Sequence, residues 1–215
     1  MADGKIIKSL RYGGDTSLKT VVILGMGDSR VKCPYDKGYE IWGVNNVYRL
    51  KGVEYVNKLF LAHKQVYYPD GEPYFDWERM NNLNVDILNI HKVKGLKSRI
   101  YPYKRISKKY NTNYFSNCIC YMLAYALDKG YERILIYGVD MIYGSEYTEE
   151  KGGVEYWIGR AQGMGVEVEI CADSFLLKTI DLKPYGFEYK LKDIDPHGYY
   201  KVKDGKLVLK EIVES

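Results

Sequence analysis

A buried strand that runs straight into a glycine turn constrains this chain more than any other feature. Residues 21–24 are four consecutive apolar residues, and Gly25-Met26-Gly27-Asp28-Ser29 follows them directly. Such a strand is typical of the interior of a parallel sheet, and a Gly-x-Gly turn at its end lets backbone amides approach a phosphate. Open parallel sheets bind ligands at the carboxyl ends of their strands. The turn therefore predicts a nucleotide site, with a plain strand-to-loop turn as the alternative.

Two better-known phosphate-binding patterns are absent from the sequence. The dinucleotide fingerprint requires a third glycine three residues after the second, and this chain has Arg30 there. A Gly-Lys-Ser or Gly-Lys-Thr triplet does not occur anywhere. The turn thus indicates a nucleotide as ligand and leaves the base unidentified, and we expect no obligatory cofactor.

Composition narrows the class of protein. The chain has 215 residues, 28% of them charged and 46% hydrophobic, as in globular domains. No apolar run approaches the ~18 residues that span a bilayer, and the first five residues lack the apolar core of a signal peptide. We therefore expect a cytoplasmic protein with no membrane span. The oligomeric state stays open, a homo-oligomer included.

The cysteines and the basic residues each suggest one conclusion. Cys33, Cys118, Cys120 and Cys171 form no Cys-x-x-Cys pair, which favours reduced, partly buried thiols and no metal site.

Eight lysines and arginines gather over residues 92–109, interleaved with tyrosines, a pattern that can bind nucleic acid. Because the net charge is only +4, we favour a solvated loop beside an anionic pocket and consider nucleic acid the least favoured partner.

Strand and helix patterns alternate along most of the chain. Alternation of this kind predicts an α/β fold, with a Rossmann-like, mostly parallel sheet and helices on both faces. We expect strands at residues 20–24, 40–44, 58–61, 85–89, 133–137 and 166–170. We expect helices at residues 76–82, at 113–129 and around 154–161.

The pattern changes from Tyr185 onward. Residues 199–209 place Asp204-Gly205 between two alternating segments, which is a β-hairpin signal. We predict a Rossmann-like nucleotide-binding domain over residues 1–184 and a C-terminal β-hairpin appendage over residues 185–215.

Polar residues at the predicted strand ends form a candidate site, because the carboxyl ends of parallel strands meet at one edge. Together they offer amides, carboxamides, a histidine, a lysine, a hydroxyl and a carboxylate, which suits a ribose and its phosphate better than a metal. The set is Gly25, Gly27, Asp28, Ser29, Asn45, Asn46, His63, Lys64, Ser116, Asn117, Gly138 and Asp140. Tyr143 follows in a loop suited to a lid. Structural roles are the alternatives, such as a turn at residues 45–46 or a cap at Asp140.

Four segments, in order over about residues 20 to 180, resemble bacterial sialyltransferases of the family 42 type. Residues 25–29 resemble the Gly-Asn-Gly-Pro-Ser turn of that family, and residues 39–46 resemble its second strand, which ends in an asparagine that contacts the donor. Residues 116–140 are similar to its serine-led helix and following Gly-Ile-Asp strand, and residues 171–177 to its late Cys-Pro-Asn-Ser-Leu-Leu segment. Related uncharacterised domains, some carried by phages, share this layout.

The resemblance implies a Rossmann-like sheet, a cytidine monophosphate sugar donor, and inverting transfer without an obligatory metal. It implies that Gly25, Gly27 and Ser29 hold the phosphate. It also implies that Asn45 contacts the donor and that Ser116 contacts the nucleotide or the sugar.

One departure concerns the catalytic base. The family places a histidine after the Gly-Ile-Asp strand, whereas no histidine lies between His91 and His197 here. A base must have a suitable pKa and reach the acceptor, and His63 and a glutamate, Glu149, are the candidates. Two functions therefore stay open. One is a glycosyltransferase-like enzyme with a nucleotide-sugar donor, and the other is a protein that binds or sequesters a nucleotide or signalling nucleotide unchanged.

Overall fold

The chain forms a single seven-stranded sheet in its larger part. The computed structural model describes residues 18–50, 53–142, 147–178, 200–203 and 206–209. The strands of the sheet are β1 (Thr20–Leu24), β2 (Glu40–Val44), β3 (Lys58–Leu61), β4 (Asp86–Asn89), β5 (Arg99–Ile100), β6 (Arg133–Tyr137) and β7 (Glu167–Ile170). Every pairing between them is parallel. The predicted α/β, Rossmann-like fold class is confirmed.

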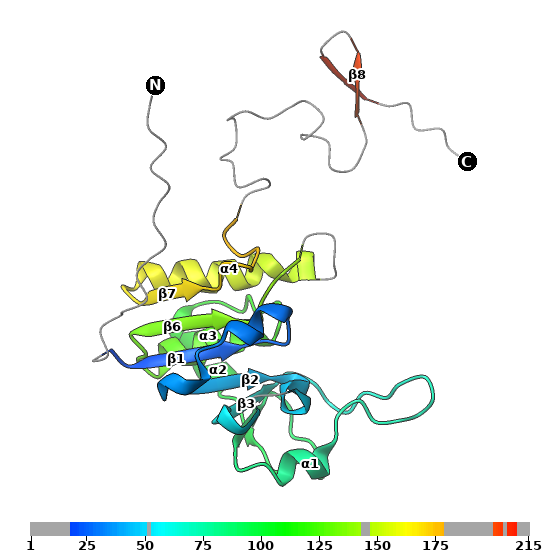
Figure 1. Ribbon diagram of the computed structural model, residues 1–215, viewed down its shortest axis with the longest axis vertical. Coiled ribbons are helices and arrows are strands. Elements are labelled where there is room, and N and C mark those ends of the chain that lie inside the picture. Colours follow the sequence, from blue (N-terminus) through cyan, green and yellow to red (C-terminus); the bar gives the residue numbers. More distant parts are fainter. Residues whose placement is uncertain (1–17, 51–52, 143–146, 179–199, 204–205, 210–215) are drawn as a thin grey trace. The chain divides into compact units, whose positions relative to one another are not determined.

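The strand order places a reversal of direction beside β1. The order is β5-β4-β3-β2-β1-β6-β7, so the chain moves outward from β1 to β5 and then returns to the other side of β1 (Figure 1). Ligands of open α/β sheets bind outside the carboxyl ends of the strands at such a point. A ligand site is therefore expected at the carboxyl ends of β1 and β6.

Alternate side chains of the central strands pack into two separate hydrophobic cores, one on each face of the sheet. Val21 and Ile23 of β1 face one core, while Val22 and Leu24 face the other. Both faces of the sheet are covered, so its strands are apolar throughout rather than alternating. The helices of the protein are α1 (Trp77–Asn81), α2 (Tyr103–Tyr110), α3 (Cys118–Asp128) and α4 (Tyr147–Gly163).

The two faces carry different kinds of cover. Residues of α2, α3 and α4 pack in the first core, with Trp157 of α4 fully buried there. The second core is covered by α1, through Met80, and by short 3-10 turns. These turns are η1 (Asp28–Lys32), η2 (Tyr35–Lys37), η3 (Asn45–Arg49) and η4 (Val53–Tyr55).

Two local expectations were wrong. The stretch 92–109 is not a continuous loop, because it contains β5 and most of α2. Ile106 and Tyr110 of α2 are both buried and lie four residues apart, which is a helical spacing. The many lysines around them hid this signal in the sequence. The long helix begins at Cys118 rather than residue 113, because the side chain of Asn117 caps it by accepting a hydrogen bond from the Cys120 amide at 3.2 Å.

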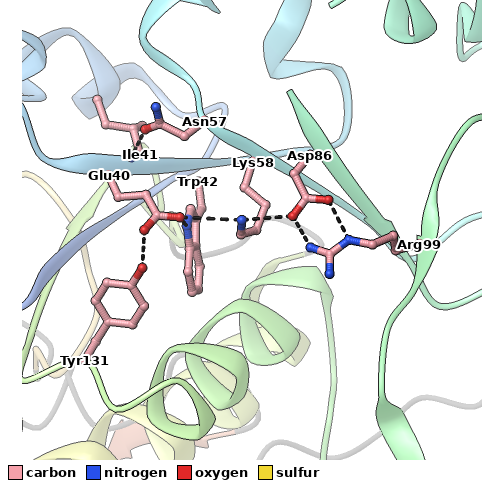
Figure 2. A network of polar contacts seen from close by, with 8 residues as sticks. All are labelled: Glu40, Ile41, Trp42, Asn57, Lys58, Asp86, Arg99 and Tyr131. Atoms are coloured by element: carbon pink, nitrogen blue, oxygen red, sulfur yellow. Dashed lines mark hydrogen bonds and ion pairs between the residues drawn. The ribbon is translucent and has the colours of Figure 1, made fainter. Parts of the chain in front are cut away.

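A ladder of charges crosses the opposite, amino-terminal edge of the sheet (Figure 2). Lys58 of β3 lies between Glu40 of β2, at 3.5 Å, and Asp86 of β4, at 3.0 Å. Arg99 of β5 binds Asp86 with both its Nε, at 2.8 Å, and an Nη. The Tyr131 hydroxyl donates to the other oxygen of Glu40. Four neighbouring strands are thus joined in register far from the switch point.

A second, smaller unit follows the sheet. The chain divides into Met1–Leu176 and Leu177–Ser215. In the second unit, β8 (Tyr200–Lys203) and β9 (Lys206–Leu209) pair antiparallel, as the hairpin signal predicts. The predicted boundary at residue 184 and the Asp204-Gly205 turn lie outside the described residues. Across the part of the chain that the structure describes, no helix has the length and apolar content needed to cross a bilayer.

Candidate functional site

The loops after β1 and β6 meet at the switch point through their backbones. The Gly25 amide donates to the carbonyl of Tyr137, and the Gly27 amide donates to that of Gly138, each at 2.8 Å. A Cβ on Gly25 would lie 2.1 Å from the Gly138 oxygen, and Gly138 itself has φ +67°. Gly27 faces a side chain instead, because its Cβ would lie 2.4 Å from the Asp140 carboxylate. Close contact between these loops explains why Gly25, Gly27 and Gly138 have no room for a side chain.

Ser29 and Asp140 lock the two loops together. The Ser29 hydroxyl donates to Asp140 Oδ1, and the Ser29 amide donates to Oδ2 at 3.1 Å. The same hydroxyl accepts a hydrogen bond from the Gly138 amide at 2.7 Å. Ser29 is only 2% exposed. Its hydroxyl therefore makes its hydrogen bonds within the protein and is not available to a ligand.

A cavity of about 270 Å³ opens next to this lock. The ends of β1, β2 and β6 and the beginnings of α3 and α4 surround it, so it gathers segments far apart in the sequence. The residues that line it are Gly25, Met26, Gly27, Asp28, Val44, Asn45, Asn117, Cys118, Ile119, Gly138, Val139, Asp140, Met141, Ile142 and Glu150. Seven predicted site residues are among them: Gly25, Gly27, Asp28, Asn45, Asn117, Gly138 and Asp140.

Asn45 is the lining residue with an unused polar atom. Its backbone is left-handed, with φ 48°, a conformation that asparagine tolerates better than most residues. Its side-chain Oδ1 is buried and has no hydrogen-bond partner in the protein. Asn46 also has a buried Oδ1 without a partner, but it does not line the cavity, and its Nδ2 donates to the Tyr74 carbonyl at 3.1 Å. A buried acceptor without a donor is costly, so a rotation of the Asn45 side chain that turned Oδ1 toward the cavity would let a ligand donor satisfy it.

The amino-terminal ends of two helices supply the rest of the wall. Asn117 caps α3, and its Nδ2 donates to Glu150 Oε2 at 3.0 Å. Glu150 lies in the first turn of α4. The amides of a first helical turn point outward and carry partial positive charge. Ser116 lies behind this wall, because its hydroxyl donates to the Glu150 carbonyl at 2.8 Å.

Glu150 is the lining carboxylate that sequence reasoning missed. We named Glu149, which is exposed and does not line the cavity. The signal was present in α4, where Glu150 precedes Val154, Trp157 and Ile158 at the helical spacing of the buried face. Position on that face predicts which of two adjacent glutamates points inward.

The remaining predicted residues lie outside the cavity. His63 follows β3 with its ring stacked on Phe75 at 5.8 Å, and Lys64 beside it is exposed. Partial burial and the nearby charge of His91 lower the pKa of His63, while the charge of Glu150 opposes this shift. Tyr143 falls outside the described residues.

The cavity is acidic and partly apolar. Asp28, Asp140 and Glu150 line it, and no lysine, arginine or histidine is among the described lining residues, although Arg30 pairs with Asp28 at 3.3 Å. Burial raises the pKa of the Cys118 thiol well above its usual range, so this lining cysteine is a neutral thiol. Within the described ranges, no three His, Cys, Asp or Glu side chains gather closely enough to hold a metal ion. Hydroxyl groups of a sugar or ribose suit these carboxylates as hydrogen-bond donors.

Comparison with known proteins shows a likeness of fold. No family model matches the sequence, and no curated protein matches it. The sialyltransferase CstII from Campylobacter jejuni, solved with CMP-3FNeuAc, is 16% identical, with a TM-score of 0.50 over 74% of this chain and 83% of that one. Its structure with cytidine-5'-monophosphate gives 17% identity and a TM-score of 0.49, over 74% and 82%. The protein is thus structurally similar to a sialyltransferase at low sequence identity.

Proposed function

We propose that the protein is a glycosyltransferase-like enzyme that binds a nucleotide sugar in the cavity at the switch point. The observation that carries this proposal is the buried, partnerless Oδ1 of Asn45 in the wall of that cavity. The CstII fold to which the chain is similar was solved with CMP-3FNeuAc, which supports a cytidine monophosphate sugar as the donor.

In this proposal, different lining groups contact different parts of the donor. Asn45 accepts a hydrogen bond from the base or the ribose. The phosphate lies against the first-turn amides of α3, at Cys118 and Ile119, whose partial positive charge offsets the neighbouring carboxylates. Asp140 and Glu150 accept hydrogen bonds from sugar hydroxyls.

The proposed reaction transfers the sugar with inversion. An acceptor hydroxyl attacks the anomeric carbon, the bond from that carbon to the phosphate oxygen breaks, and the nucleotide leaves with the electron pair. A base takes the proton of the hydroxyl. Glu150 fits this role better than Glu149, because Glu150 lines the cavity, and His63 remains the histidine candidate.

The test compares two asparagines that share the same positive φ. Asn45 and Asn111 both have φ 48°, so alanine imposes a similar strain at each, and Asn111 lies at the end of α2 outside the cavity. We expect Asn45→Ala to weaken CMP binding in titration calorimetry by about tenfold or more, since a buried acceptor loses its partner. Asn111→Ala should bind CMP as the wild type does. Equal affinities in both variants, or no CMP binding by the wild type, would contradict the proposal.

A binding protein without catalysis is the second candidate. The observation in its favour is that no histidine is among the described residues that line the cavity. Incubation with CMP-sialic acid separates the two: release of CMP over time supports the enzyme, and recovery of the intact ligand from the protein supports sequestration.

A further inference from the structure

A second, larger groove lies along the same edge of the sheet, beyond β3 and β4. Its volume is about 770 Å³, and the segment between β3 and α1 forms most of it. Figure 1 shows this segment as a loop that extends from the sheet between β3 and α1. The groove is lined by Arg49, Gln65, Tyr67, Tyr68, Glu72, Pro73, Phe75, Asp76, Trp77, Val93 and Lys94. None of these residues lines the first cavity.

Aromatic rings held in place by one another form its walls. Trp77 stacks on Phe75 with ring centroids 5.0 Å apart and an angle of 7°. Tyr68 packs against Tyr74 at 5.3 Å. Tyr67 is 64% exposed, although the loop around it is ordered by a Tyr68–Glu72 backbone hydrogen bond of 2.8 Å. Exposed rings on a fixed loop offer flat apolar faces to a ligand without a large loss of entropy.

Unused hydrogen-bonding groups alternate with these rings. Gln65 donates to the Phe75 carbonyl at 3.0 Å, but its buried Oε1 has no partner. The side chains of Glu72 and Lys94 have no hydrogen bond or ion pair with any other described residue. The groove thus supplies acceptors and a donor next to apolar faces, which is how small-molecule sites fix the orientation of a ligand.

The charges of the groove favour an uncharged ligand. Arg49 and Lys94 balance Glu72 and Asp76. A nucleic acid or an acidic peptide would meet the two carboxylates, and a basic peptide would meet the two cations. A sugar chain has apolar ring faces and many neutral hydroxyls, so it matches both the rings and the balanced polar groups.

We infer that this groove is a saccharide-binding site, formed by residues 65–77 with Arg49, Val93 and Lys94. The inference rests on the proposed function in one respect, which is that the bound saccharide is the acceptor of the sugar. His63 lies beside the groove, because its ring stacks on Phe75 with centroids 5.8 Å apart, and it follows β3 at the same carboxyl edge of the sheet as the cavity. As a candidate base, it would place the proton acceptor of the proposed reaction next to the bound saccharide.

The test uses the full chain on a printed array of defined mono- to tetrasaccharides. We expect binding to a subset, which Tyr67→Ala and Trp77→Ala each weaken about tenfold or more. Tyr67 is largely exposed, so its variant stays folded even if loss of Trp77 disturbs α1. Tyr55→Ala is the matched control, because Tyr55 is a 47% exposed tyrosine that lines neither site. It should leave saccharide binding unchanged.

Two further measurements separate this inference from the proposed function. CMP binding should be equal in the wild type and in Tyr67→Ala. Saccharide binding without any CMP binding would overturn the proposed function and leave a saccharide-binding protein. CMP binding with no saccharide bound by the wild type would overturn the groove alone. A dimer in light scattering that Tyr67→Ala dissociates, again with no saccharide bound, would reassign the groove to a contact between two copies of the chain.

Discussion

Single residues at the switch point are fixed by neighbours more than a hundred positions away. Gly25 has no room for a side chain, because the backbone of Gly138 occupies that space. Ser29 has no free hydroxyl, because Asp140 and the Gly138 amide use it. The amides of Gly25 and Gly27 and the Ser29 hydroxyl are thus used within the protein, and the proposed function therefore assigns the phosphate to the first-turn amides of α3.

A pair of glycine substitutions tests this account of the turn. Gly25→Ala should lower the free energy of unfolding by about 3 kcal/mol, since its Cβ would lie 2.1 Å from the Gly138 oxygen. Gly159→Ala is the control in the exposed middle of α4, where a Cβ meets nothing within 4 Å. It should raise stability by up to about 1 kcal/mol, because alanine favours a helix. Urea unfolding measures both, and an unaffected Gly25→Ala would contradict the close contact.

Whole elements are joined by the charge ladder at the other edge of the sheet. Burial raises the pKa of Glu40, but the Tyr131 and Trp42 hydrogen bonds and the Lys58 charge outweigh it and leave that pKa lowered. Asp86 behaves likewise, with Arg99 and Lys58 as the groups that lower its pKa against burial. A lowered folded-state pKa contributes stability above the unfolded pKa of about 4 and loses it as the pH falls through the folded value.

This ladder predicts a pH-dependent cost for losing its central lysine. Lys58→Met should destabilise the fold by about 1–2 kcal/mol at pH 7, because Glu40 and Asp86 lose a partly buried countercharge. The deficit should shrink below about pH 4 as the carboxylates become protonated. Lys32→Met is the control, because the Lys32–Asp173 pair is about half exposed on both sides and worth little. A deficit that is the same at pH 3 and pH 7 would rule out the ladder as its cause.

At the scale of the whole molecule, the sheet and both of its cores are built from the first unit. The described core residues end at Leu176, and Ser174 fixes that end by donating to the Val139 carbonyl at 2.6 Å. The hairpin of β8 and β9 belongs to the second unit. We therefore expect the sheet to fold without the hairpin.

Truncation after Lys178 tests the independence of the first unit. We expect the shortened chain to unfold cooperatively, with a free energy of unfolding within about 1 kcal/mol of the full chain, because no described core residue is removed. Thermal unfolding followed by circular dichroism measures this. CMP affinity of the truncated chain serves as a second readout. Loss of the cooperative transition would show that residues after 178 stabilise the sheet.

The sequence by itself determined the strands, their parallel arrangement and the edge that holds the candidate site. Apolar runs, helical spacing and glycine turns are local signals, and each strand of four or more residues in the sheet matched one. The two-residue β5 and the helix α2 were hidden, because exposed lysines dominate that stretch and, within α2, only Ile106 and Tyr110 are buried.

Only the tertiary structure decided which polar groups are free to meet a ligand. It places Ser29 against Asp140, leaves the Oδ1 of Asn45 without a partner, and points Glu150 rather than Glu149 into the cavity. It also assembles the aromatic groove from three separate stretches of the chain. The physical reason is that a hydrogen bond between distant residues depends on how the elements pack, whereas a helix or strand depends first on its own spacing of apolar side chains.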